Sequence, residues 1–278
     1  MTTHDKRAHL RELLRDCGSA VIGYSGGVDS VFLARIATDV LGAENVLAVT
    51  GKSDSVAVWM EDTAREVAAR FGIPWLEVET REMDDPRYAA NPSNRCYFCK
   101  TELWGRLRGV ALARGYRTVL DGSNADDVGD HRPGAAAAAE HAVRSPLLEA
   151  GLTKAEIRAW SRELGLPTWD QPAAPCLASR LPYGLAVTPQ RLKQVERAEL
   201  ALRALGLRDF RVRHHGEVAR LEVHPSELGH AAALREAVDA AVRGAGFARV
   251  LLDLQGYRRG ALNEVLPAAR LVRLGNAA

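Results

Sequence analysis

The chain has 278 residues, of which 47% are hydrophobic and 26% charged, and its formal net charge is +2. This length allows two modest domains with ample cores, and the composition is that of an ordinary globular protein. A nearly neutral chain lacks the overall basic charge of most nucleic-acid-binding proteins, so no nucleic-acid partner is expected.

The start of the chain and its cysteines suggest where it works. The first residues lack the apolar core of a secretion signal, and no stretch approaches the roughly 18 apolar residues of a membrane span. We therefore expect a cytoplasmic protein without a membrane partner. In that compartment the 4 cysteines are expected to be thiols, metal ligands or catalytic groups rather than structural disulfides.

The first half of the chain alternates strand-like and helix-like segments. Helical patterns separate short apolar runs, and the order predicts an α/β domain over residues 1–170. Its sheet should be parallel and doubly wound, with helices on both faces and ligands at the carboxyl ends of the strands. The predicted strands are 21–24, 46–50, 75–79 and 118–121, and the predicted helices are 30–40, 56–71 and 102–114.

The first predicted strand runs into Ser25-Gly26-Gly27-Val28-Asp29-Ser30. Two glycines let backbone N–H groups approach an anion closely, and the helix that follows directs the positive end of its dipole to the same place. Ser25 and Ser30 add hydroxyl donors, and Asp29 is placed to hold magnesium on bound phosphates. Because the Lys and the spacing of a Walker A loop are absent, the hexapeptide looks like the pyrophosphate loop of enzymes that split ATP into AMP and pyrophosphate.

The second half begins with irregular segments. Residues 122–146 are predicted to be an active-site loop region with a short helix. A helix at 153–164 should start at Thr153, with Glu156 closing a capping box, and prolines then interrupt regular structure around 171–175. The remaining pattern predicts a smaller α+β domain, so the second domain covers 171–278. Its predicted elements are a helix at 190–205, strands at 210–213 and 219–223, a helix at 227–244 and a strand at 250–254.

Three cysteines lie in loop-like segments. Cys96 and Cys99 are three positions apart, Cys176 follows Pro175, and Cys17 stands outside every motif. The three could be unrelated thiols, or the first two could be a redox pair. With an added histidine they could hold zinc, and by themselves they could hold an iron–sulfur cubane with one open iron. The residues alone leave these alternatives open.

Taken together, these segments resemble the LarE family, ATP-dependent sulfur transferases that build the nickel-pincer nucleotide cofactor. The resemblance covers nearly the whole chain, and its most specific part is Pro175-Cys176-Leu177-Ala178-Ser179-Arg180-Leu181-Pro182-Tyr183-Gly184. The pyrophosphate loop alone would be shared with many ATP pyrophosphatases. Further segments that carry the resemblance are 124–127, 132–134, 145–147, 210–213 and 219–223.

The resemblance implies an enzyme that uses ATP and magnesium to adenylate a carboxylate of a pyridinium dicarboxylate mononucleotide. Sulfur then replaces AMP and leaves a thiocarboxylate. In one branch of the family the cysteine at the position of Cys176 gives up its own sulfur and ends as dehydroalanine. A second branch has three cysteines and binds a [4Fe–4S] cluster that carries sulfide, and Cys96, Cys99 and Cys176 make this chain similar to that branch.

The resemblance also implies partners and residue roles. The partners would be the nucleotide substrate, inorganic sulfide or another sulfur donor, and further copies of the chain in a homo-oligomer. Arg211 and Arg213 would clamp the substrate's phosphate from one face of a strand. Glu199 and Cys17 receive no role. The sulfur-transfer site would comprise Cys176, Ser179 and Arg180, and the ATP site Ser25, Gly26, Gly27, Asp29, Ser30 and Asp126, with magnesium on Asp29.

Three other functions would use parts of the same pattern. A tRNA thiolation enzyme shares the loop and the cysteines but needs a basic RNA surface. An amide-forming ligase of the GMP or NAD synthetase kind shares the loop but has no use for three site cysteines. A non-catalytic ATP- or cluster-binding switch would release no pyrophosphate.

Overall fold

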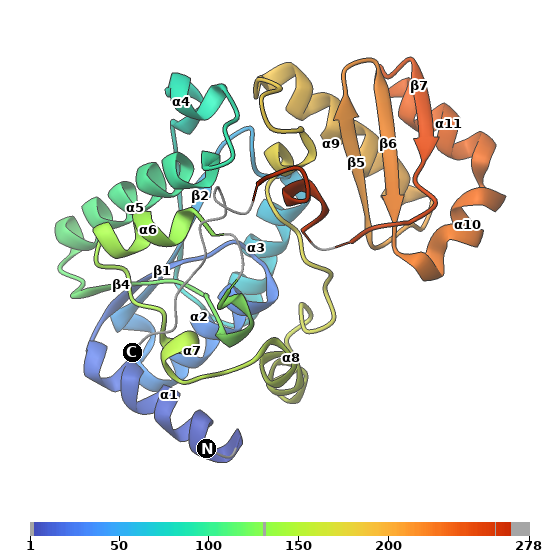
Figure 1. Ribbon diagram of the computed structural model, residues 1–278. Coiled ribbons are helices and arrows are strands. Elements are labelled where there is room, and N and C mark those ends of the chain that lie inside the picture. Colours follow the sequence, from blue (N-terminus) through green and yellow to red (C-terminus); the bar gives the residue numbers. More distant parts are fainter. Residues whose placement is uncertain (1–2, 130–131, 259, 268–278) are drawn as a thin grey trace. The chain divides into compact units, whose positions relative to one another are not determined.

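The computed structural model describes residues 3–129, 132–258 and 260–267 (Figure 1). By its internal packing the chain divides into two units, the first comprising the described chain up to Glu82 together with Asn94–Ala173. The second comprises Met83–Ser93 and the described residues from Ala174 onward. Residues 83–93 fall within the predicted first domain but pack in the second unit, where the side chain of Asn91 donates to the carbonyls of Pro182 and Leu185, both at 2.8 Å.

The first unit is built on a four-stranded parallel sheet in the order β3-β2-β1-β4. Val21 of the central strand pairs with Leu47 on one side and with Val119 on the other. All four predicted strands are present, which confirms the alternating pattern. The strands are β1 (Ala20–Gly23), β2 (Val46–Lys52), β3 (Trp75–Glu79) and β4 (Thr118–Leu120).

Alternate residues of this sheet face two separate cores, because side chains alternate across a strand. Ala20 and Ile22 belong to one core and Val21 to the other. Helices cover both faces (Figure 1), which confirms the doubly wound α/β class. The first core takes side chains from α1 (Thr3–Cys17), α2 (Val28–Leu41), α3 (Val58–Arg70), α7 (Pro146–Glu149) and α8 (Lys154–Glu163), and the second from α5 (Arg95–Arg114) and α6 (Gly134–Glu140).

Helix α5 begins well before its predicted start at 102, so Cys96 and Cys99 lie on a helix and not in a loop. The sequence from 95 to 101 has no helical apolar period, and tertiary packing compensates for it. Tyr97 donates a hydrogen bond to Glu140 of α6 at 2.8 Å. Contacts with another helix therefore stabilise a turn that the local pattern does not predict.

The second unit holds the predicted small α+β arrangement. Its sheet has the order β5-β6-β7, with β5 and β6 antiparallel and β6 and β7 parallel. The helix predicted at 227–244 is two helices, because Leu234 leaves helical geometry at φ −91° and ψ 16°. The elements are α4 (Pro86–Ala89), η4 (Leu177–Arg180), α9 (Pro189–Ala204), β5 (Phe210–His215), β6 (Val218–Val223), α10 (Leu228–Ala233), α11 (Arg235–Gly244) and β7 (Arg249–Leu252).

Helices and arginines lie on opposite faces of this small sheet. His214 of β5 lies 3.1 Å from Gln194 of α9 and therefore faces the helices. Arg211 and Arg213 occupy alternate positions on β5, so they face the other way. No helix within the described ranges is both long and apolar enough to cross a membrane.

Candidate functional site

The strand order of the first unit indicates where a ligand would bind. The chain passes from β1 to β2 and β3 on one side and then returns to place β4 on the other side of β1. The strand order reverses between β1 and β4, and open α/β sheets bind ligands at the carboxyl ends of the strands at such a switch point. The segment after β4 packs against the start of α2, since a Cβ added to Gly122 would lie 3.2 Å from the backbone N of Ser30.

The predicted pyrophosphate loop turns the chain from β1 into α2. Gly26 has a φ of +73°, and a Cβ there would lie 2.9 Å from the carbonyl O of Met60. The hydroxyl of Ser30 donates to the carbonyl O of Gly27 at 3.1 Å and lies 3.2 Å from Oγ of Ser25. Gly27 is the N-cap of α2, and no side chain of the described residues caps it. The first N–H groups of α2 therefore keep their capacity to bind an anion.

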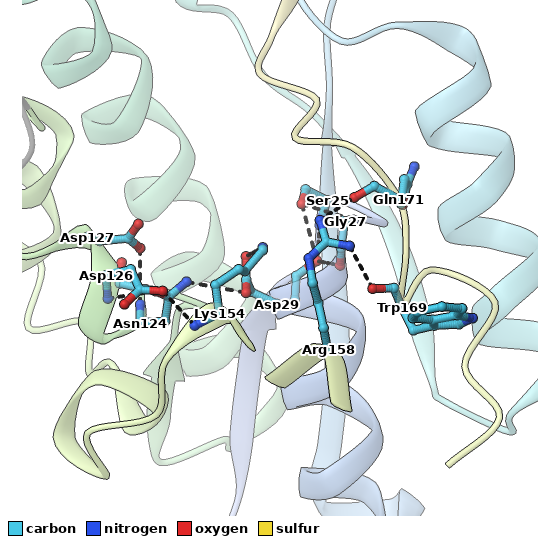
Figure 2. A network of polar contacts seen from close by, with 12 residues as sticks. Ser25, Gly27, Asp29, Asn124, Asp126, Asp127, Lys154, Arg158, Trp169 and Gln171 are labelled. Carbon is cyan, nitrogen blue, oxygen red and sulfur yellow. Dashed lines mark hydrogen bonds and ion pairs between the residues drawn. The ribbon is translucent and has the colours of Figure 1, made fainter. Parts of the chain in front are cut away.

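Asp29, in the first turn of α2, has a donor on each carboxylate oxygen. Its Oδ1 accepts a hydrogen bond from the side-chain amide of Asn124 at 3.3 Å, and its Oδ2 forms an ion pair with the ammonium group of Lys154 (Figure 2). The carboxylate remains partly exposed, as a ligand for a hydrated ion must be. A carboxylate beside the predicted pyrophosphate loop fits magnesium, which binds through one or two carboxylates together with substrate phosphates.

The turn after β4 presents Asn124 to this carboxylate. Oδ1 of Asn124 accepts from the backbone N of Asp126 at 3.0 Å, and its backbone N donates to Asp127 at 3.1 Å, which completes a capping box. Asp126 itself accepts from the backbone N of Lys154, the first residue of α8, at 2.8 Å. The structure thus places the carboxylate of Asp126 at the positive end of a helix dipole, while its contact with magnesium or nucleotide stays a prediction.

Two basic residues of α8 complete the network and were missed from the sequence. Lys154 pairs with Asp29, and Arg158 donates to the carbonyls of Trp169 and Gln171, both at 2.7 Å (Figure 2). The capping box that starts α8 could have shown that positions 154 and 158 share a helix face. The capping box could not have shown which residues that helix face contacts.

The paired cysteines lie at the start of α5. Cys96 and Cys99 are one helical turn apart, the first exposed and the second half-buried. Helix α6 begins against this turn, since a Cβ on Gly134 would lie 2.8 Å from Cγ of Lys100. Cys176 is a half-buried thiol in the second unit, just before η4. Among the described residues, no three His, Cys, Asp or Glu side chains lie close enough together to hold a metal ion.

Arg180 organises the turn that carries Cys176. Arg180 is only 2% exposed, and its guanidinium group forms two 2.9 Å hydrogen bonds to the carboxylate of Glu199 on α9. It also donates to the carbonyls of Pro175 and Cys176. Burial alone would raise the pKa of Glu199, but the charge and hydrogen bonds of Arg180 hold that pKa below its usual value. Arg180 therefore holds the backbone of Cys176, and Glu199 gains a role that the sequence did not assign.

The two predicted phosphate ligands are largely buried, with Arg211 1% and Arg213 7% exposed. Arg213 pairs with Glu222 at 2.7 Å and donates to the carbonyl O of Ser179 at 2.9 Å. The guanidinium group of Arg211 lies 4.4 Å from the ring centre of Tyr257. Burial and the neighbouring charge of Arg180 lower the pKa of Arg211. Arg213 thus links β5 to the η4 turn, while Arg211 lies against the ring of Tyr257.

Comparison with known proteins shows two kinds of likeness. The NAD synthase family model matches residues 3–116, a stretch that contains the pyrophosphate loop. The glutamine-dependent NAD(+) synthetase of Rhodobacter capsulatus is 35% identical, but over only 37% of this chain and 20% of that protein. The likeness to NAD synthetases is thus confined to part of the chain.

Other relatives match over almost their full length. An uncharacterised protein of Synechocystis sp., slr1717, is 46% identical over 94% of this chain and 98% of that protein. The pyridinium-3,5-bisthiocarboxylic acid mononucleotide synthase of Lactiplantibacillus plantarum is 35% identical over 97% of this chain and 98% of that protein. The structure agrees with this likeness, since the predicted pyrophosphate loop lies at the switch point of a doubly wound sheet and the second unit carries the cysteine turn. The identity and its coverage show that the chain belongs to the LarE family of the PP-loop superfamily.

Proposed function

We propose that this chain is an ATP-dependent sulfur transferase that converts a carboxylate of a pyridinium dicarboxylate mononucleotide into a thiocarboxylate. One observation carries the proposal. The match to the Lactiplantibacillus plantarum synthase covers 97% of the chain, so it runs through the loop of the first unit and the cysteine turn of the second. A match restricted to the first unit would support ATP use only.

The first step is adenylation. A carboxylate oxygen of the substrate attacks the α-phosphorus of ATP, the bond from that phosphorus to the bridging oxygen breaks, and pyrophosphate leaves. The N–H groups at the start of α2 and the hydroxyls of Ser25 and Ser30 would hold the pyrophosphate. Asp29 would hold magnesium, which when bound offsets the charge of the phosphates.

The second step is sulfur transfer. A hydrosulfide attacks the acyl carbon, the bond from that carbon to the AMP oxygen breaks, and loss of a proton leaves the thiocarboxylate and AMP. Arg211 and Arg213 would orient the substrate through its phosphate. Because Arg213 already pairs with Glu222, the phosphate must compete with that carboxylate. Arg180 would position the turn of Cys176 and Ser179 through its backbone hydrogen bonds.

We further propose that Cys96, Cys99 and Cys176 hold a [4Fe–4S] cluster, which when bound would supply sulfide from its open iron. The donors are of the right kind, since all three are thiols and two lie one turn apart on α5. Cys176 belongs to the other unit, so it must meet α5 for the cluster to form. If it does not, the Cys176 thiol can instead attack the acyl carbon itself, so that the bond from that carbon to the AMP oxygen breaks and a thioester forms. Removal of the Cα proton of Cys176 and cleavage of its Cβ–S bond then release the thiocarboxylate and leave dehydroalanine.

The test is chemical analysis of anaerobically purified protein. We expect iron and sulfide in the wild type, loss of both in Cys96→Ala, Cys99→Ala and Cys176→Ala, and pyrophosphate release with ATP and substrate that Asp29→Ala abolishes. Cys17→Ala is the matched control, since that thiol is buried and donates to the carbonyl of Leu13 at 3.2 Å.

The outcomes separate the two sulfur sources. A Cys96→Ala, Cys99→Ala double variant that transfers one sulfur and leaves Cys176 lighter by about 34 Da would show sacrifice of the thiol in place of a cluster. Wild-type protein that releases no pyrophosphate with the mononucleotide would contradict the proposed function itself.

A further inference from the structure

We propose that the ion pair between Lys154 and Asp29 opposes magnesium binding at Asp29 and that ATP relieves this opposition, so that metal and nucleotide bind together at this site. The inference rests on the proposed function, in which Asp29 holds magnesium. It assigns to Lys154 a positioning role on α8, which neither the loop motif nor the cysteines indicate.

Lys154 is anchored at two points. Its backbone N donates to Oδ2 of Asp126 at 2.8 Å, and its ammonium group pairs with Oδ2 of Asp29. Asn124 donates to the other oxygen of Asp29 at 3.3 Å. Each oxygen of the Asp29 carboxylate therefore already has a hydrogen-bond donor, and the donor from Lys154 carries a full positive charge.

This arrangement opposes a divalent cation that arrives alone. A metal ion that binds Asp29 must displace the ammonium group from the carboxylate and then stand close to its charge, which repels it. ATP changes this balance because its phosphates bring negative charge and further oxygen ligands for the ion. The ammonium group then has an anionic neighbour other than Asp29, and the carboxylate becomes available to the metal. Nucleotide and metal should therefore bind with positive coupling.

The fold does not need the side chain of Lys154. Helix α8 has its own start, in which the side chain of Thr153 and that of Glu156 form a capping box. Glu156 also pairs with Lys6 of α1 at 2.8 Å, which fixes the helix to its neighbour. The side chain of Lys154 is 28% exposed and belongs to neither core. Its contact with Asp29 therefore contributes little that the capping box and the α1 contact do not already provide.

The test measures metal binding directly, with Mn²⁺ as the probe and electron paramagnetic resonance as the readout. Lys154→Met keeps the length of the side chain and removes its charge. Without nucleotide, we expect this variant to bind one Mn²⁺ about tenfold more tightly than the wild type. With the uncleavable analogue α,β-methylene ATP, the ratio of Mn²⁺ affinities with and without nucleotide should be smaller in the variant.

Two further variants make the result specific. Lys6→Met removes a lysine that is paired with the same helix but not with Asp29, and it should bind Mn²⁺ as the wild type does. Adding Asp29→Asn to Lys154→Met should abolish the gain. Equal Mn²⁺ binding by wild type and Lys154→Met, or a gain that survives Asp29→Asn, would overturn the inference.

The same measurements separate this inference from the proposed function. If the wild type binds Mn²⁺ only with the nucleotide analogue but Lys154→Met behaves identically, the ATP site stands and only the role of Lys154 fails. If no protein binds Mn²⁺ even with the analogue, the magnesium site of the proposed function fails.

Discussion

Arg180 and Glu199 form a buried two-point ion pair that joins the cysteine turn to the small sheet. Both hydrogen bonds of the pair are 2.9 Å long, and Glu199 also accepts from the backbone N of Val212 on β5 at 3.1 Å. One carboxylate thus satisfies a guanidinium group and a strand N–H away from water. The position of Cys176 depends on this pair, because Arg180 holds the carbonyl of Cys176 at 3.1 Å.

We predict that Glu199→Gln lowers the free energy of unfolding by about 3–5 kcal/mol, since it leaves a buried guanidinium charge without its counter-charge. Denaturant titration measures the loss. Glu236→Gln, an exposed carboxylate in the same unit, should change stability by no more than about 0.5 kcal/mol. Similar small changes in both variants would show that the buried pair is not a stabilising element.

Glu156 should make stability depend on acid pH. Burial alone would raise its pKa, but hydrogen bonds from Lys6 and Thr153 lower it from 4.5 to about 2. Since the folded-state pKa is the lower one, the unfolded chain takes up this proton first as the pH falls. The stabilisation is complete above pH 4.5 and is lost as the pH falls from 4.5 to about 2.

Glu156→Gln should therefore cost about 1 kcal/mol at pH 7 and flatten this part of the stability profile. Unfolding free energies measured between pH 2 and pH 7 test the prediction. Glu12→Gln, an exposed carboxylate on α1, should leave the profile as it is. A wild-type profile that is already flat in this window would contradict the assignment.

Gly26→Ala should destabilise the protein by more than about 2 kcal/mol and abolish ATP binding. The new side chain is strained at a positive φ, and its Cβ also collides with a neighbouring backbone atom. Its Cβ would lie 2.9 Å from the carbonyl O of Met60, at a φ of +73°. Gly72→Ala is the matched control, with a φ of +63° and no described atom within 4 Å of the added Cβ. The control should lose about 1 kcal/mol and keep ATP binding. Equal losses in the two variants would rule out the collision as the cause.

Arg211→Ala and Arg213→Ala should each weaken binding of the pyridinium dicarboxylate mononucleotide by about tenfold or more and leave ATP binding unchanged. The reason is that both side chains lie on the second unit, outside the pyrophosphate loop. Calorimetric titration with each ligand tests this, and Arg243→Ala on the exposed side of α11 serves as the control. If the variants lose affinity for ATP as well as for the mononucleotide, the arginines support the fold of the second unit instead.

The strands of the first unit and the start of α8 were predictable from the sequence because their signals are local. Apolar runs separated by helical periods define β1 to β4, and Thr153 and Glu156 are close enough in sequence to form a capping box within one turn. The Gly-Gly turn after β1 is local in the same sense. A phosphate loop at a strand end could therefore be predicted without knowledge of the fold.

The partners of the charged side chains could not be predicted in this way. Lys154 and Asp29 are separated by 125 residues, and only the return of the chain to place β4 beside β1 brings the α8 segment to the loop. The early start of α5 and the pairing of Arg180 with Glu199 likewise depend on a second helix. Sequence patterns determined the strands of the first unit and the Gly-Gly turn after β1, because those depend on neighbours within a few residues. Tertiary structure alone decided which charges meet, because such contacts depend on strand order and helix packing.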